Sequence, residues 1–350
     1  MSALVDQVDH FQRRRRVIGV PLAVIYKFND DQGSYLAAVI TYYAFIAIFP
    51  LLLIASSVLG FVLQGNEKLQ QEVLTSALSQ FPIVGTQLGK PGGIQGSTSA
   101  VLVGGLTALY GIVGLGQAAQ NSVNATWAVP RNSRLNPLLS RVSSLALLLL
   151  AGLTVLAVTV LTSVASHVDV ISSDVDRWIR LLFSLGSLAL NALVLSLMMR
   201  LVALRRQSFR SSLPGGVAVA VMWQLLQLAG GTYVSHVVSR ASDMNAIFAV
   251  VLGLVALLYV AATMWVIGLE INVVLHSHLY PRALLTPFTD AVSLTEADRR
   301  AYAGYAKAQR YKGFQRVRVT FTDRAKGDGA AAGPARDPDD VDPDLDGPQI

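Results

Sequence analysis

Cysteine is absent from the 350 residues, which excludes disulfide bonds and thiolate metal sites. Charged residues are scarce at 14% of the chain, whereas hydrophobic residues make up 53% and the mean hydropathy is +0.49. A soluble domain usually carries about a quarter charged residues. The composition therefore predicts an integral membrane protein rather than a soluble one.

Histidine is also rare, and its distribution argues against a hydrolytic metal centre. Of the five histidines, only His276 and His278 lie close in sequence. Side chains two residues apart on a helix point to different sides, so a shared metal ion is not expected. The chain has no Gly-Lys-Ser/Thr phosphate loop, no nucleophile elbow and no kinase motif set. We therefore expect no enzyme activity, no catalytic residue, no metal and no cofactor.

Long segments without Asp, Glu, Lys or Arg predict membrane-spanning helices. The first covers residues 32–66, and others cover 91–130 and 142–168. Because a bilayer core of about 30 Å needs only ~20 apolar helical residues, each is long enough to span. We place the start of the fifth span at Pro214, since proline is tolerated in a first helical turn. The pattern predicts an all-α bundle of six transmembrane helices, at residues 35–63, 99–129, 142–166, 178–200, 214–238 and 246–275.

The N-terminal arm, residues 1–31, combines four consecutive arginines with a short apolar segment, residues 17–26. That segment is too short to span a bilayer, and no small-residue cleavage pattern of a signal peptide follows it. An amphipathic helix on the cytoplasmic membrane face fits the pattern better. The residues expected to contact lipid headgroups are Arg13, Arg14, Arg15 and Arg16.

Three further segments are predicted to lie outside the bilayer core. Residues 67–84 form an amphipathic helix that follows the first span. The basic tail, residues 280–325, contains a predicted helix at 294–311 and a short strand-like stretch at 317–321. Residues 326–350 are predicted to be disordered, because Ala, Gly, Pro and seven Asp residues cannot bury a core.

The basic residues are distributed asymmetrically between alternate loops of this topology. The N-terminal arm, the loops after the second and fourth spans and the tail hold 23 of the 28 Lys and Arg residues, and the opposite side holds 5. The positive-inside rule therefore places both termini in the cytoplasm. The net charge of +6 follows from this topology and from attraction to lipid headgroups, so no nucleic-acid partner is expected.

Polar side chains recur at helical spacing along every predicted span. In lipid such stripes must face each other or a wet cavity, because exposed polar groups are costly there. Two interpretations stay open, namely hydrogen bonds that join the helices and a hydrophilic path for a substrate. The candidate path-lining residues are Tyr35, Tyr42, Tyr110, Gln117, Asn121, Asn124, Asn191, Gln224, Gln227, Tyr259, Thr263 and Glu270.

Glu270 is the only acid well inside a charge-free segment, about one turn from the predicted cytoplasmic end of its span. Three roles are open for it: a proton or cation site, a partner for a loop arginine, or an end residue that snorkels to the interface. No second buried acid is expected, so an obvious proton relay is not predicted.

Several short motifs lie along the predicted spans, namely Ala37-Ala38, Thr41-Tyr42-Tyr43, Phe49-Pro50-Leu51, Asn121 to Trp127, Pro214-Gly215, Trp223 and Gly268 to Asn272. Together these motifs resemble the YihY/BrkB family, with the YhjD-like proteins as the nearest branch. The resemblance covers about Phe11 to Leu279 and implies a six-span bacterial inner-membrane protein, associated with envelope integrity and suspected of transport. Ile247-Phe248-Ala249 stands where the family often has Tyr-Gly, so a glycine-dependent bend is not carried over. The family has also carried a ribonuclease label, which the scattered histidines disfavour.

These observations favour an inner-membrane transporter or lipid-handling exporter that supports envelope integrity and has no ATP-hydrolysing machinery of its own. The alternative is a non-transporting envelope scaffold whose polar stripes only pack the helices together. The expected partners are membrane lipids and an unidentified small-molecule or lipid substrate, and the chain could also form a homo-oligomer.

Overall fold

The computed structural model describes residues 3–62, 98–134, 136, 139–144, 173–203, 208–237, 243–289 and 292–321. All regular structure in these residues is helical, and they contain no strand, so the predicted all-α class is confirmed. The chain divides into two compact units. We call Met1–Ala23, Pro130–Asn132 and Leu279–Ile350 the terminal unit, and Val24–Val129 and Ser133–His278 the helical unit.

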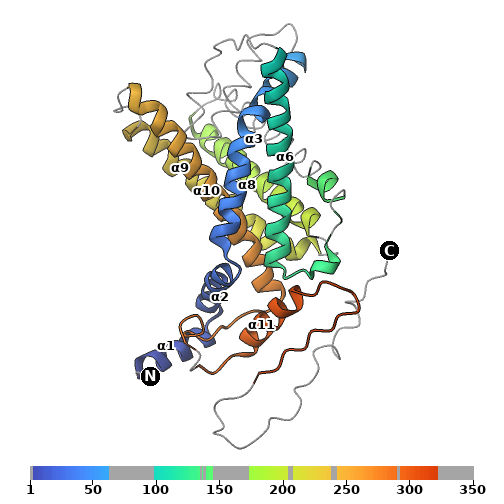
Figure 1. Cartoon of the computed structure of the whole chain (residues 1–350). Helices are drawn as coiled ribbons and strands as arrows, with labels where there is room; N and C mark the ends of the chain where they lie inside the picture. The colour runs from blue at the N-terminus through green and yellow to red at the C-terminus, as the bar shows by residue number, and fades with distance from the viewer. Residues whose placement is uncertain are drawn as a thin grey trace, which may run out of the picture. The chain divides into compact units, whose positions relative to one another are not determined.

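In its described residues, the helical unit contains five long helices, α3 (Gly33–Val62), α6 (Thr98–Thr126), α8 (Ser173–Val202), α9 (Phe209–Val237) and α10 (Asp243–His276) (Figure 1). Each has between 29 and 34 residues, and a helix of 30 residues is about 45 Å long. Helix α3 packs against α6, and α8 packs against α9. Helix α10 contacts α3, α6 and α9, so it joins the two pairs.

These five helices contain the first, second, fourth, fifth and sixth predicted spans, apart from a few terminal residues. The third predicted span and the amphipathic segment 67–84 lie outside the described residues, except for 142–144. In the described part of the chain, Ser184–Val202 and Val251–His276 are long and apolar enough to cross a membrane. The count of six spans therefore stays a prediction.

Small residues bring α9 close to its neighbours at the level of Pro214. A Cβ atom added to Gly215 would lie 2.0 Å from the carbonyl oxygen of Gly268 in α10. One added to Gly216 would lie 2.1 Å from Oγ of Ser196 in α8. Any larger side chain would push these helices apart, which is the packing that small residues permit between membrane helices.

Pro214 does not stand at a helix start as expected, because α9 begins five residues earlier at Phe209 and holds Pro214 inside the helix. The start of the fifth span in the membrane stays a prediction. Ser208 provides the start, since its hydroxyl accepts a hydrogen bond from the backbone N–H of Arg210 at 3.3 Å, as helix N-caps do. Pro214 has no N–H and disturbs the backbone ladder around it. The N–H of Gly215 instead donates to Oδ1 of Asn272 at 2.7 Å.

The terminal unit contains α1 (Ala3–Arg14), the first half of α2 (Arg16–Asp30), the start of the 3-10 helix η1 (Arg131–Ser133) and α11 (Glu296–Ala308). Helix α11 confirms the helix predicted in the basic tail, with shorter bounds. The predicted strand at residues 317–321 is wrong, because the backbone there is irregular. An isolated extended segment is not stable as a strand, and no described residue forms a strand beside it.

Candidate functional site

Glu270 is fully buried in α10, and its carboxylate pairs with a lysine from the N-terminal arm. Oε2 of Glu270 lies 3.5 Å from Nζ of Lys27, whose side chain is only 2% exposed. Lys27 belongs to α2 and lies in the helical unit with Glu270. The snorkelling interpretation is therefore wrong, and the partner in this ion pair is not a loop arginine.

The ammonium group of Lys27 makes two shorter contacts. Nζ lies 2.5 Å from Oδ2 of Asp31 and donates to the backbone carbonyl oxygen of Thr126 at 2.9 Å. Thr126 is the last residue of α6, where carbonyl groups lack partners within the helix and the helix dipole is negative. Burial alone would lower the pKa of Lys27, but Glu270 and Asp31 act against it, and the pKa is raised overall. Lys27 therefore stays charged at neutral pH.

The local sequence explains how Lys27 and Asp31 come together. The two residues are four positions apart, which places their side chains on one face at the end of α2. The chain then turns at Gln32, which has a φ of 54°, and α3 begins at Gly33. Gly33 packs on the ring of Phe28, where an added Cβ atom would lie 2.4 Å from the ring. This tight turn fixes the Asp31 side chain, which is 3% exposed, inside the unit.

Asp31 is a second buried acid, contrary to the expectation that Glu270 would be the only one. Its carboxyl group contacts the same ammonium group as Glu270, since Nζ of Lys27 lies 2.5 Å from Oδ2 of Asp31 and 3.5 Å from Oε2 of Glu270. Apart from the Lys27 contact at 3.5 Å, neither oxygen of Glu270 has a hydrogen-bond partner among the described residues. We call Lys27, Asp31 and Glu270 the charge cluster. Within the described ranges, no group of three His, Cys, Asp or Glu residues could hold a metal ion.

The Gly268 to Asn272 motif places the charge cluster beside a second polar contact. Asn272 accepts a hydrogen bond from the backbone of Gly215 and directs its amide nitrogen to Sδ of Met199 at 3.3 Å. Glu270 and Asn272, two residues apart in α10, therefore contact different helices: Glu270 contacts α2, and Asn272 contacts α9 and α8. This explains physically why the Pro214-Gly215 and Gly268 to Asn272 motifs occur together.

Ten of the twelve candidate path-lining residues are not buried within the described structure. Tyr35, Tyr42, Tyr110, Asn121 and Tyr259 are exposed, and Gln117, Asn191, Gln224, Gln227 and Thr263 are half-buried. Only Asn124 and Glu270 are buried. Some of the residues meet in small groups, since the ring of Tyr43 lies 5.1 Å from that of Tyr42 and 5.8 Å from that of Tyr110. A path lined by the whole set stays a prediction.

The four arginines predicted to contact lipid headgroups have different surroundings. Arg13 pairs with Asp9 at 2.6 Å. Arg15 lies over the ring of Phe11, 4.7 Å from its centre, and the side chains of Arg14 and Arg16 are exposed. Contact of these residues with lipid stays a prediction.

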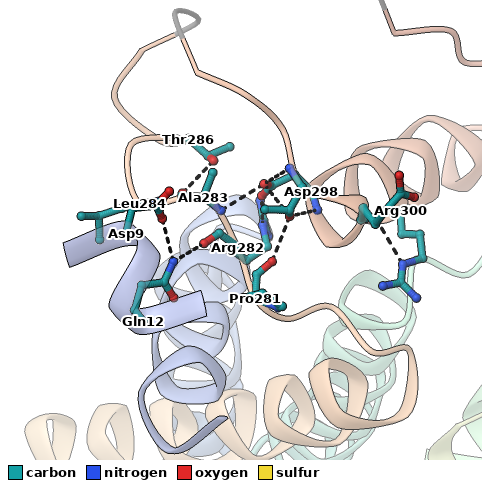
Figure 2. A network of polar contacts seen from close by, with 11 residues as sticks. Asp9, Gln12, Pro281, Arg282, Ala283, Leu284, Thr286, Asp298 and Arg300 are labelled. Carbon is teal, nitrogen blue, oxygen red and sulfur yellow. Dashed lines mark hydrogen bonds and ion pairs between the residues drawn. The ribbon is translucent and has the colours of Figure 1, made fainter. Parts of the chain in front are cut away.

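The terminal unit contains another buried ion pair, between Arg282 and Asp298 (Figure 2). Asp298 lies in the first turn of α11, where it forms a capping box with Thr295. Its Oδ2 accepts hydrogen bonds from the backbone N–H groups of Ala283 at 3.0 Å and Thr295 at 2.9 Å. Sequence reasoning missed this pair, although a threonine three residues before an acid at a helix start was a usable signal.

Hydrogen bonds of the same network join α1 to the segment that follows α10. Gln12 donates from Nε2 to the backbone carbonyl oxygen of Arg282 at 2.6 Å, and the N–H of Leu284 donates to Oδ1 of Asp9 at 3.1 Å (Figure 2). Burial raises the pKa of Asp9, but hydrogen bonds from Arg13, Gln12 and Leu284 outweigh this, so the pKa is lowered overall. The N-terminal arm is therefore held by specific contacts in its own unit.

The described residues form an all-helical fold in which two segments are long and apolar enough to cross a membrane, which is typical of a helical membrane protein. The sequence matches the family described as Virulence factor BrkB over residues 24–289, which include the whole charge cluster. The chain belongs to this family, and the resemblance seen in the motifs is confirmed. No curated protein and no solved structure matches the chain.

Proposed function

We propose that the chain is a six-span bacterial inner-membrane transporter or lipid-handling exporter that supports envelope integrity, with both termini in the cytoplasm. Family membership supports a membrane protein, and the charge asymmetry of the loops supports the orientation. The arginines at positions 13–16 contact anionic headgroups in this proposal. The observation that carries the transport role is the charge cluster.

Burying ionised groups costs several kcal/mol for each ion, and ionisable residues inside membrane proteins commonly mark ion or substrate pathways. Apolar residues of similar volume would pack the helices equally well. The cluster also depends on three elements, since Lys27 comes from α2, Thr126 ends α6 and Glu270 lies in α10. A movement of α10 would change every contact of Glu270, which suits a site that works in two conformations.

An envelope scaffold is the second candidate function, and the packing of α9 favours it. The close approach of Gly215 to Gly268 and of Gly216 to Ser196 leaves little room for relative motion between these helices. A scaffold needs such rigid contacts and no change in the charge cluster. The two candidates therefore differ in what they require of Glu270.

Complementation in a strain that lacks the gene tests the two functions. Envelope leakage to a normally excluded dye is measured with the wild-type chain, with Glu270→Gln and with the exposed control Glu296→Gln, each at matched membrane abundance. Transport predicts that Glu270→Gln fails to restore the barrier while the control succeeds. Full restoration by Glu270→Gln at normal abundance would favour the scaffold.

The absence of cysteine allows the orientation to be tested without background labelling. Single cysteines are placed at Ser133, which follows the second predicted span, and at Asp174, which precedes the fourth. A membrane-impermeant thiol reagent added to intact spheroplasts should label the Asp174 position and leave Ser133 unlabelled until the membrane is opened. Labelling of the Ser133 position from outside would overturn the proposed topology.

A further inference from the structure

The charge cluster contains two carboxyl groups and one ammonium group in a buried site. The side chains of Lys27, Asp31 and Glu270 are 2%, 3% and 0% exposed. With all three groups ionised the cluster would carry one uncompensated negative charge. The carbonyl end of α6 at Thr126 adds further negative potential next to Lys27. A buried net charge of this kind is costly, and binding one proton removes it.

Among the described residues, the hydrogen bonds show that Glu270 is the acid of the cluster that lacks a hydrogen-bond donor. Lys27 donates to Asp31 at 2.5 Å and to the carbonyl of Thr126 at 2.9 Å, whereas its contact with Glu270 is longer, at 3.5 Å. In the described part of the chain, both oxygens of Glu270 are buried without a donor. The Asp31 carboxyl shares the Lys27 ammonium with Glu270 in the same buried site, and a carboxyl group can donate a hydrogen bond only when it is protonated.

We propose that Asp31 and Glu270 share one exchangeable proton beside Lys27, so that the charge cluster is a proton-binding site. The proton supplies the donor that the Glu270 oxygens lack and makes the three groups neutral in sum. A metal cation is a poor occupant, because the ammonium of Lys27 already lies among the Asp31, Glu270 and Thr126 oxygens.

The proton binding can be coupled to movement of the helices, and this part rests on the proposed transport function. When the shared O–H bond breaks and the proton passes to water, two carboxylates face each other at close range. Their repulsion favours separation of α10 from the turn between α2 and α3. Protonation restores the contact, so the proton acts as the coupling ion of the transporter.

Infrared spectroscopy of the purified full chain in lipid bilayers tests the proton site. We expect a protonated-carboxyl C=O band at neutral pH that shifts on exchange into D2O. Both Glu270→Gln and Asp31→Asn should abolish it, because either change leaves one carboxylate that pairs with Lys27. The control Glu296→Gln, at an exposed acid of α11, should leave the band unchanged. Two separate variants are used so that a folding failure of one does not decide the result.

Three outcomes would overturn the proposal. A wild-type spectrum at neutral pH without a band that the two variants remove would show that both acids are ionised. A band that persists in Asp31→Asn would show that Glu270 holds a proton alone. A band that disappears when Na+ replaces K+ would show that the site binds a metal cation. None of these measurements depends on transport, so full restoration of the barrier by Glu270→Gln, together with an intact wild-type band, would reject the proposed function and leave the proton site in place.

Discussion

In the described part of the chain, the charge cluster and the Arg282–Asp298 pair differ in how completely their buried acids are hydrogen-bonded. Each oxygen of Asp298 in the terminal unit has a donor, since Oδ1 contacts Arg282 and Oδ2 accepts from the backbone of Ala283 and Thr295. Glu270 in the helical unit has one ion pair at 3.5 Å and no hydrogen-bond donor among the described residues. A satisfied buried charge holds a fold together, whereas an unsatisfied one is available for proton exchange.

The largest expected effect is at the satisfied pair. Arg282→Leu should destabilise the terminal unit by about 3–5 kcal/mol, because it leaves the Asp298 carboxylate buried without its cation. Limited proteolysis with increasing urea should show cleavage around α11 at lower urea than in the wild type. The control is Arg300→Leu, at an exposed arginine of α11. If both variants resist the protease equally, the pair does not stabilise the unit.

The stability of the charge cluster should respond differently, because removing the Lys27 cation together with one acid should cost less than removing the cation alone. Lys27→Met leaves two carboxyl groups without a cation and should destabilise the helical unit by about 3 kcal/mol. The double variant Lys27→Met/Glu270→Gln should recover much of this loss, since it buries one carboxyl group fewer. Thermal unfolding of the wild type, the single variants Lys27→Met and Glu270→Gln and the double variant gives the coupling energy between the two residues. Additive losses would contradict an electrostatic link between Lys27 and Glu270.

Helix packing beside the cluster gives a smaller effect. Gly215→Ala should cost about 1–3 kcal/mol, because its Cβ atom would overlap the carbonyl oxygen of Gly268 at 2.0 Å. Gly186→Ala in α8 is the control, since an added Cβ there meets nothing within 4 Å. The control should unfold at the same temperature as the wild type or higher, because alanine favours helix. Equal melting temperatures for both variants would show that α9 and α10 are not tightly packed.

The smallest effect should be a pH dependence at the edge of the terminal unit. The pKa of Asp9 is lowered from 3.8 in the folded chain, so its contacts contribute stability above pH 3.8 and lose it as the pH falls through the lowered value. Proteolysis of α1 should therefore increase on acidification below pH 4. In Asp9→Asn this step should be absent. A step of equal size in that variant would assign it to another group.

Hydropathy and charge predicted the long helices of the helical unit well, because long apolar segments need only local sequence to form helix. They also singled out Glu270, whose isolation in a charge-free segment was visible directly. They did not predict its partner, because Lys27 is far away in sequence and no periodicity records which helices meet. Asp31 was assigned to the arm for the same reason, although its spacing from Lys27 was a usable signal.

The errors have similar physical causes. The start of α9 was placed at Pro214 on a proline rule, but the Ser208 cap determined it instead. The Arg282 and Asp298 pair was missed because it depends on how a loop folds back on α11. Local sequence therefore predicted which segments are helical and failed where a long-range polar contact decides the structure.

Matched amide substitutions at the two buried acids test the central claim most directly. Thermal unfolding is measured in lipid for Glu270→Gln and for Asp298→Asn, each beside the wild-type chain. The account predicts that Glu270→Gln unfolds within about 1 kcal/mol of the wild type, because an amide resembles the protonated acid. Asp298→Asn should lose about 3 kcal/mol or more, because it breaks a satisfied charge pair. Equal destabilisation by the two variants would contradict the distinction between a structural charge and an exchangeable one.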